Sequence, residues 1–311
     1  MTRSLVIGGN GFIGSHLVDK LAALGREVTV FDRFSHGLQS YQAPGIRRYI
    51  GDFLNLDDLR QAVVGQDEVF HFLSVTTPAT AHNDPSLDIR VNTQQSVELF
   101  DACATAGVQM LYFASTGGAI YGETSAPRVS ENDRTNPKSP YAISKLSLEH
   151  YLEYFRATKD LNYRSFRISN PYGPRQNPVK PQGLIPIVLR QIAAGKPVLV
   201  FGDGSMVRDY LYVGDLVNMI GMSLDVPGNH RVYNVGSGAG KSINQVFETI
   251  RDVVGVDFSV ERRPSPPTYV QRVVLDMERF NSDFGDHEMV SLEEGVLKTW
   301  RSIVEPQFSY N

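Results

Sequence analysis

The sequence has one cysteine, no marked excess of either charge and no long apolar run. Because Cys103 stands alone, no disulfide can form within the chain, which favours a reducing compartment such as the cytoplasm. The net charge of -4, without a block of like charges, disfavours a nucleic-acid or anionic membrane surface. No stretch approaches the roughly 18 apolar residues of a membrane span. The first apolar segment is too short for a signal peptide, and no metal site is predicted.

The 311 residues are enough for one large domain or two interlocked domains. Strand-like and helix-like segments alternate in the first half, which predicts an α/β fold with a doubly wound, Rossmann-type parallel sheet. In such a sheet, a ligand crevice lies at the carboxyl ends of the strands. Strands are expected at 4–9, 27–32, 47–52, 68–73 and 110–115, and helices near 11–25, 55–64, 86–106 and 139–158.

After about residue 168 the segments become shorter, and prolines and glycines become frequent. We therefore expect a cofactor-binding domain over 1–168 and a smaller α/β substrate domain over 169–311. The two are expected to interleave, with segments near 209–236 returning to the first domain. There is no internal repeat and no long linker.

Three glycines, Gly8, Gly11 and Gly14, follow the first strand directly and open the first helix. This is the context of a dinucleotide-binding loop: the first glycine permits the tight turn, the second lets the backbone approach a pyrophosphate, and the third allows close packing of helix and strand. The helix N-terminus offers N–H groups to the phosphates. Phe12 and Ile13, in the same loop, are counted with the expected cofactor contacts.

Asp32 ends the second strand, 18 residues after Gly14. A carboxylate at this place accepts hydrogen bonds from the ribose hydroxyls and repels a 2'-phosphate, so NAD is favoured over NADP. The neighbouring Arg33 would tolerate the phosphate. The alternative is a glycine-rich turn with a capping aspartate.

The segment "YAISK" places Tyr141 and Lys145 four residues apart, on one face of the expected helix. A tyrosine titrates near about 10, and a nearby ammonium group lowers its pKa. Lowering the pKa by roughly three units takes about 4 kcal/mol. The pair is therefore a candidate for proton transfer at neutral pH, the alternative being a solvated helix face.

Together these segments resemble the extended short-chain dehydrogenase/reductases of the nucleotide-sugar epimerase/dehydratase type, the group of UDP-galactose 4-epimerase. The resemblance covers most of the chain. Besides the glycine loop and the Tyr-Lys pair, it rests on "GDFLN" (51–55), "SNPYGPRQ" (169–176), "GDGSMVRDYLYVGD" (202–215) and "YNVGSG" (233–238).

The resemblance implies roles for further residues. Those expected at the cofactor are Asp52 and Phe53 beside adenine, Leu73, Ser74 and Ser115 toward the nicotinamide, Asn92, and Lys145 at the ribose. Those expected at the substrate are Asn170 and Arg208 on the diphosphate, and Leu184 and Phe201 around the nucleotide base. Ordinary core positions are the alternative for Leu184 and Phe201.

The chain departs from the family pattern at several positions. Gly117 stands where the family has a hydroxyl residue, so the resemblance assigns the helper hydroxyl to Thr116, redirected by a turn at two glycines. The alternative is that Thr116 only caps a local turn. The resemblance implies that Arg263 or Arg272 takes the place of the family's second phosphate-binding arginine. Ser169 stands where the family often has a bulky residue before the diphosphate asparagine. Val273 falls at the family position that gates the sugar pocket.

The activity implied is NAD-dependent 4-epimerisation of a nucleoside-diphosphate sugar, a UDP-hexose or UDP-N-acetylhexosamine, through a 4-keto intermediate. Tyr141 is the expected base. The alternatives are an NAD(P)H-dependent 4-ketoreductase, a 4,6-dehydratase, which is disfavoured because "TGGAIYG" offers no carboxylate, and a silent NAD-binding regulator. The family usually dimerises through the helices expected near 86–106 and 139–158, so a homodimer is expected.

Overall fold

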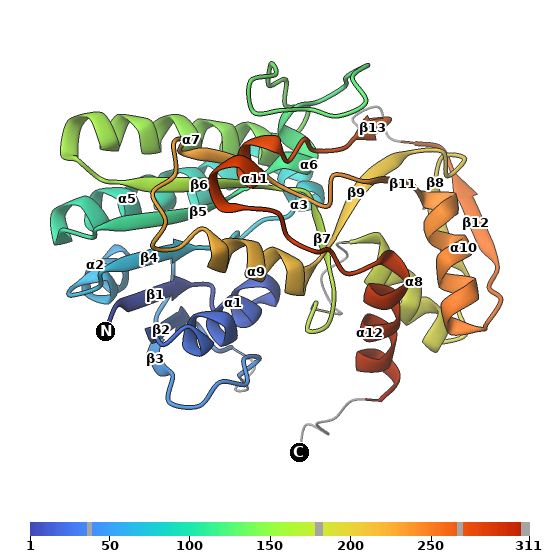
Figure 1. The fold of residues 1–311 in the computed structure, drawn as a ribbon, viewed down its shortest axis with the longest axis horizontal. Coiled ribbons are helices and arrows are strands. Elements are labelled where there is room, and N and C mark those ends of the chain that lie inside the picture. The colour runs from blue at the N-terminus through green and yellow to red at the C-terminus, as the bar shows by residue number, and fades with distance from the viewer. Residues whose placement is uncertain (36–38, 178–182, 266–269, 306–311) are drawn as a thin grey trace.

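The computed structural model describes residues 1–35, 39–177, 183–265 and 270–305. A seven-stranded parallel sheet, in the order β10-β6-β5-β4-β1-β2-β3, forms its centre (Figure 1). The chain runs outward from β1 to β3 and then returns to place β4 on the other side of β1, so a crevice opens where the order reverses. The strands are β1 (Arg3–Ile7), β2 (Glu27–Asp32), β3 (Arg47–Ile50), β4 (Glu68–His71), β5 (Met110–Thr116), β6 (Tyr163–Ile168) and β10 (Val232–Val235).

Helices cover both faces of this sheet, which confirms the predicted doubly wound architecture (Figure 1). Along β1, Val6 points to one face while Leu5 and Ile7 point to the other, and all are fully buried, as expected for a parallel sheet covered on both sides. One face packs against α1 (Phe12–Ala23), α9 (Val213–Met222) and α11 (Glu278–Phe284), and the other against α2 (Leu56–Val63), α5 (Gln95–Ala106) and α7 (Pro140–Lys159).

The C-terminal part forms a smaller α/β layer with its own apolar cluster. One small sheet joins β11-β9-β13 with β7 beside β9, and another pairs β12 with β8. The strands are β7 (Asn170–Tyr172), β8 (Val198–Phe201), β9 (Val207–Tyr212), β11 (Gly240–Ser242), β12 (Val260–Arg263) and β13 (Arg272–Val273). The helices are α8 (Leu184–Ala193), α10 (Ile243–Val254) and α12 (Leu292–Val304).

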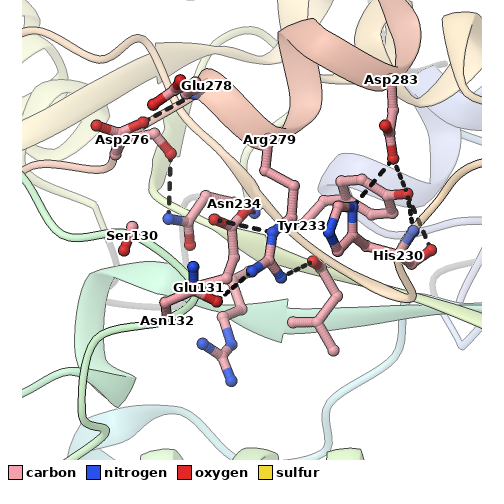
Figure 2. Close-up of polar contacts among 12 residues, drawn as sticks. Ser130, Glu131, Asn132, His230, Tyr233, Asn234, Asp276, Glu278, Arg279 and Asp283 are labelled. Carbon is pink, nitrogen blue, oxygen red and sulfur yellow. Dashed lines mark hydrogen bonds and ion pairs between the residues drawn. The ribbon is translucent and has the colours of Figure 1, made fainter.

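Although it follows residue 168 by a long way, β10 completes the large sheet by pairing in parallel with β6. A cluster of polar side chains connects β10 to the neighbouring elements (Figure 2). The carboxylate of Glu131 accepts the backbone N–H of Asn234 at 2.6 Å and lies 3.6 Å from the guanidinium of Arg279 on α11. The Asn234 side chain in turn accepts a hydrogen bond from the Tyr121 hydroxyl at 2.6 Å, so the cluster continues toward the middle of the sheet.

The helix predicted near 86–106 is confirmed, because the chain is helical from residue 85 to residue 106, but the hydrogen-bond pattern of its first part differs from that of an α-helix. The chain forms two short helices, α3 (Pro78–Asn83) and α4 (Pro85–Asp88), then a π-helical segment over Ile89–Gln94, and only then α5. A π turn is wider than the 3.6-residue period from which the prediction was made. The side chains of Asp88 and Asn92, at the start and middle of this segment, turn inward to buried partners.

Candidate active site

One cleft of about 610 Å³ lies at the carboxyl ends of β1, β2, β4, β5 and β6. It gathers every expected cofactor residue except Asn92, together with Thr116 and Asn170. The expected residues on its wall are Gly8, Gly11, Phe12, Ile13, Gly14, Asp32, Arg33, Asp52, Phe53, Leu73, Ser74, Ser115, Tyr141 and Lys145. Segments spread over more than 130 residues of sequence therefore converge where the strand order reverses.

The glycine loop at one end of the cleft has no room for side chains. Gly8 has a φ of +81°, and a Cβ on Gly14 would lie 2.2 Å from the carbonyl oxygen of Gly8. Gly11 caps α1 without any side-chain hydrogen bond, so the helix N-terminus is left to a ligand. These features fit a diphosphate held by backbone N–H groups.

Asp32 closes β2 at the same end of the cleft. Its carboxylate accepts the backbone N–H groups of Asn10 at 3.2 Å and Phe34 at 3.3 Å, which fixes the side chain beside the glycine loop. Each carboxylate oxygen keeps further acceptor capacity, as ribose hydroxyls require. The glycine cradle and this carboxylate together fit NAD.

Asn92 does not line this cleft, and its side chain makes hydrogen bonds to neighbouring residues. Its side-chain amide donates to Thr76 Oγ1 at 2.7 Å and to Asp88 Oδ1 at 2.8 Å, and its Oδ1 accepts the backbone N–H of Val75 at 2.8 Å. Asn92 thereby holds the loop 74–77, which does line the cleft, from behind.

Tyr141 and Lys145 lie side by side on the first turns of α7. Ser139 caps this helix by accepting the backbone N–H of Ala142 at 3.3 Å, and Pro140 begins it. The Lys145 ammonium donates to the carbonyl oxygen of Ala114 at 2.8 Å and lies 5.9 Å from the centre of the Tyr141 ring. The helix therefore presents both groups to the strand end of β5.

The pKa of Tyr141 in the protein alone is raised, whereas the lowering predicted from sequence relies on Lys145 together with the positive charge of a bound nicotinamide. Burial, and then the negative charge of Asp88, raise the pKa of Tyr141 to about 12. Burial also lowers the pKa of Lys145 to about 8, against the opposing effect of Asp88 and Glu149. The prediction considered the ammonium group but not the loss of water around both side chains, and in the protein alone that loss dominates.

A buried ion pair beneath the cleft was missed in the sequence. Glu149, one helical turn beyond Lys145, pairs with Arg167 at 2.8 Å and accepts the Ser115 hydroxyl at 2.5 Å. Arg167 also donates to the Tyr121 hydroxyl at 3.1 Å, which links the pair to the cluster of Figure 2. The four-residue spacing from Tyr141 through Lys145 to Glu149 indicates that Glu149 follows the pair along one side of the helix, but it does not indicate the partner on β6.

Thr116 ends β5 on the wall of the cleft. Among the described residues, its side chain accepts no hydrogen bond from a backbone N–H of α6, so the alternative that Thr116 caps a local turn is not supported. Gly117 begins the short helix α6 (Gly117–Ile120). The chain changes from extended to helical backbone at this glycine, and close packing gives a further reason for it. A Cβ there would lie 2.5 Å from Leu275 Cδ1 and 2.7 Å from the Arg167 carbonyl oxygen, so close packing excludes a side chain.

Of the expected substrate residues, only Asn170 lines the cleft, with its amide donating to the Asp209 carbonyl oxygen at 3.1 Å. Val273 is 1% exposed and belongs to the core, because β13 turns it inward, so the structure does not place it as a gate. The guanidinium of Arg208 donates to the Val207 carbonyl oxygen at 2.8 Å, and that of Arg272 to the Pro127 carbonyl oxygen at 3.2 Å.

The other expected substrate positions also lie away from the cleft wall. Leu184 packs partly buried against the C-terminal cluster, Phe201 ends β8 half-buried, and Arg263 ends β12 exposed to solvent. Gln176, Asn177 and Gly183, which were not singled out, line the cleft instead.

Two kinds of feature are not found in the described part of the chain. No helix in it combines the length and apolar character needed to cross a membrane. Within the same residues, no group of three or more His, Cys, Asp or Glu side chains is arranged to hold a metal ion.

Comparison with known proteins agrees with this geometry. The model of the NAD dependent epimerase/dehydratase family matches residues 4–236. A UDP-glucose 4-epimerase of Mycolicibacterium smegmatis is 33% identical over 305 residues, which are 96% of this chain and 97% of that protein. A dTDP-4-dehydro-6-deoxyglucose reductase of Escherichia coli is 29% identical over 312 residues, 96% of each chain.

The crystal structure of the Thermus thermophilus UDP-glucose 4-epimerase in complex with NAD superimposes with a TM-score of 0.90 at 34% identity. The match covers 98% of this chain and 99% of that one. A family model that spans most of the chain, a shared fold over nearly its whole length and a cleft that fits the cofactor lead to one conclusion: the chain belongs to the NAD-dependent epimerase/dehydratase family.

Proposed function

We propose that the protein inverts C4 of a nucleoside-diphosphate sugar, a UDP-hexose or a UDP-N-acetylhexosamine. The observation that supports the proposal is the cleft, whose lining includes Tyr141, Lys145 and Thr116 together with the glycine loop and Asn170. The names of the Mycolicibacterium and Thermus relatives support the same reaction.

Each group has a role in this proposal. NAD, when bound, accepts the hydride from C4 and returns it. Tyr141 takes the proton of the C4 hydroxyl and gives it back, a role that is supported by its place in the lining of the cleft on the first turn of α7. Lys145 anchors the cofactor ribose and supplies positive charge, Thr116 binds the C4 oxygen, and Asn170 holds the diphosphate side. We further propose a cytoplasmic location.

The test is incubation of the purified protein with UDP-, dTDP- and GDP-sugars, without added cofactor, read by chromatography. We expect interconversion of a 4-epimer pair and release of NAD on denaturation. The second candidate, an NDP-4-ketosugar reductase, is favoured by the Escherichia coli relative. Consumption of added NADPH by protein that carries no NAD would establish that reaction instead.

The first prediction concerns the helper hydroxyl. Thr116→Ala is expected to lower kcat about 10–100-fold, which corresponds to about 1.4–2.7 kcal/mol of barrier, because one hydrogen bond to the C4 oxygen is lost. Bound NAD, measured after denaturation, should not change. Gly117→Ser in that background should yield little folded protein and no recovery, since its Cβ would meet Leu275. Parental turnover in Thr116→Ala would exclude a catalytic role for this hydroxyl.

The second prediction concerns a homodimer formed through the outer face of α7. Ile143, Tyr151 and Tyr154 are 51%, 43% and 55% exposed on that helix, an apolar surface that a second copy would cover. Light scattering should give a dimer at micromolar concentration for the parent and a monomer for the double variant Ile143→Glu/Tyr154→Glu. Val256→Glu, a matched change at an exposed valine elsewhere, should stay dimeric. A monomeric parent would refute the proposal.

A further inference from the structure

Asp88, at the end of α4, is a fully buried carboxylate that joins three elements around the cleft. Its Oδ1 accepts the Thr76 hydroxyl, from the loop after β4, and the Asn92 amide, from the π-helical segment, at 2.8 Å for the latter. Its Oδ2 accepts the Ser144 hydroxyl of α7. Ser144 stands between Tyr141 and Lys145 in the same helix turns, so the carboxylate holds the turn that carries both.

The carboxylate has no cation in direct contact. All three of its donors are neutral, and no ion pair formed by the described residues includes Asp88. By contrast, Glu149 has Arg167 at 2.8 Å. The nearby cation that its charge acts on is Lys145, so the carboxylate is held by neutral donors and acts on the ammonium group without contacting it.

A cavity of only about 10 Å³ separates Asp88 from the reacting side chains. Its wall is formed by Asp88, Asn92, Tyr141, Ser144 and Lys145, among others. The carboxylate therefore shares this small cavity with Tyr141 and Lys145 without lining the cleft, and its charge acts on both through a medium with little water.

We propose that Asp88 is a positioning residue for the reaction inferred above. Asp88 aligns the Tyr141–Lys145 turn of α7 with the loop 74–77, and its carboxylate supplies a negative charge close to that turn. The inference rests on the proposed function for its role in turnover. The hydrogen bonds of Asp88 and its position beside Lys145, on which the inference is built, do not depend on which sugar is bound.

The consequence for Lys145 can be measured. The ionisable groups that face Lys145 are Asp88 on α4, Tyr141 and Glu149 on α7, and His71 on β4. Glu149 is balanced by Arg167, and burial and the charge of Lys145 hold the pKa of His71 well below its usual value, so His71 is neutral. Asp88 is then the main negative charge that opposes the effect of burial on the pKa of Lys145, which is about 8.

Asp88→Asn tests the proposal because it keeps the shape and removes the charge. The Ser144 hydroxyl can accept from the new amide, so the hydrogen bonds can be kept. We expect the pKa of Lys145 to fall by about one unit, measured by NMR titration of ¹³C-lysine-labelled protein with Lys145→Met to assign the signal. We also expect kcat to fall about 10–100-fold and its alkaline limb to move to lower pH, with bound NAD retained.

Ser144→Ala is the matched control, since it removes one hydrogen bond and keeps the charge. It should lower kcat about threefold to tenfold and leave the titration of Lys145 unchanged. If Asp88→Asn fails to fold, unchanged kcat in Ser144→Ala overturns the positioning role. An unchanged Lys145 titration in folded Asp88→Asn overturns the electrostatic part. The titration needs no substrate, so a parent that epimerises no sugar would refute the proposed function while a shifted Lys145 still supports this inference.

Discussion

Tyr141→Phe is expected to lower kcat by at least about 10³-fold while the fold and the bound NAD persist. Within the described residues the Tyr141 hydroxyl has no hydrogen-bond partner, so the phenyl ring can occupy the same place without leaving a polar group unpaired. What is lost is the group that exchanges a proton with the substrate. The measurement is the chromatographic epimerase assay, with NAD content and circular dichroism beside it.

The control is Tyr163→Phe, whose hydroxyl bonds to Glu153 at 3.1 Å near the amino end of β6, away from the cleft. It should keep kcat within about twofold. Near-parental turnover of Tyr141→Phe would exclude Tyr141 as the base. Because burial and Asp88 raise the pKa of Tyr141 to about 12, its function as a base at neutral pH requires that the bound cofactor and substrate stabilise the phenolate. We expect the pKa of Tyr141, read by ultraviolet difference titration against Tyr141→Phe, to fall when NAD binds.

Arg167→Met is expected to lower the free energy of unfolding by about 3–5 kcal/mol. The variant leaves the carboxylate of Glu149 buried without a cation, and it also removes the donor to the Tyr121 hydroxyl. Both side chains of the pair are less than one-tenth exposed, so water cannot take over. Denaturant unfolding followed by circular dichroism measures the loss.

The double variant Arg167→Met/Glu149→Leu separates the ion pair from its parts. Since it removes both charges and keeps apolar volume, it should recover most of the stability lost by the single change. Recovery of stability without recovery of kcat would fit a role for Glu149 in holding Ser115 beneath the cleft. A single variant that costs less than about 1 kcal/mol, or a double variant that costs the sum of both, would contradict this account.

Local patterns in the sequence predicted much of the fold and the cofactor end of the site. The glycines of the loop, the alternation of strands and helices, and the Tyr141–Lys145 spacing each depend on a few neighbouring residues, and the parallel sheet and the cleft confirm the architecture. Contacts between residues that are far apart in the sequence could not be predicted from such local patterns. Glu149 meets Arg167 only because α7 packs on β6, and Asp88 meets Ser144 across 56 residues.

Other differences have equally definite causes. The π-helical segment departs from the 3.6-residue period from which a helix is predicted, so the inward direction of Asn92 in this segment could not be predicted from that period. The inward direction of Val273 depends on how β13 pairs with β9, which no short stretch of sequence specifies. The direction of the pKa shift of Tyr141 depends on burial, which requires the whole tertiary structure.

The edge strand β10 can join the large sheet only late in the synthesis of the chain. β6 ends at residue 168, but its partner β10 begins only at residue 232. At about 5–20 residues per second, a ribosome takes several seconds or more to add that stretch. During this interval the outer edge of β6 presents unpaired backbone groups, the kind of edge that recruits other strands and leads to aggregation. A nascent chain halted between these strands should therefore depend on chaperones more than the finished one.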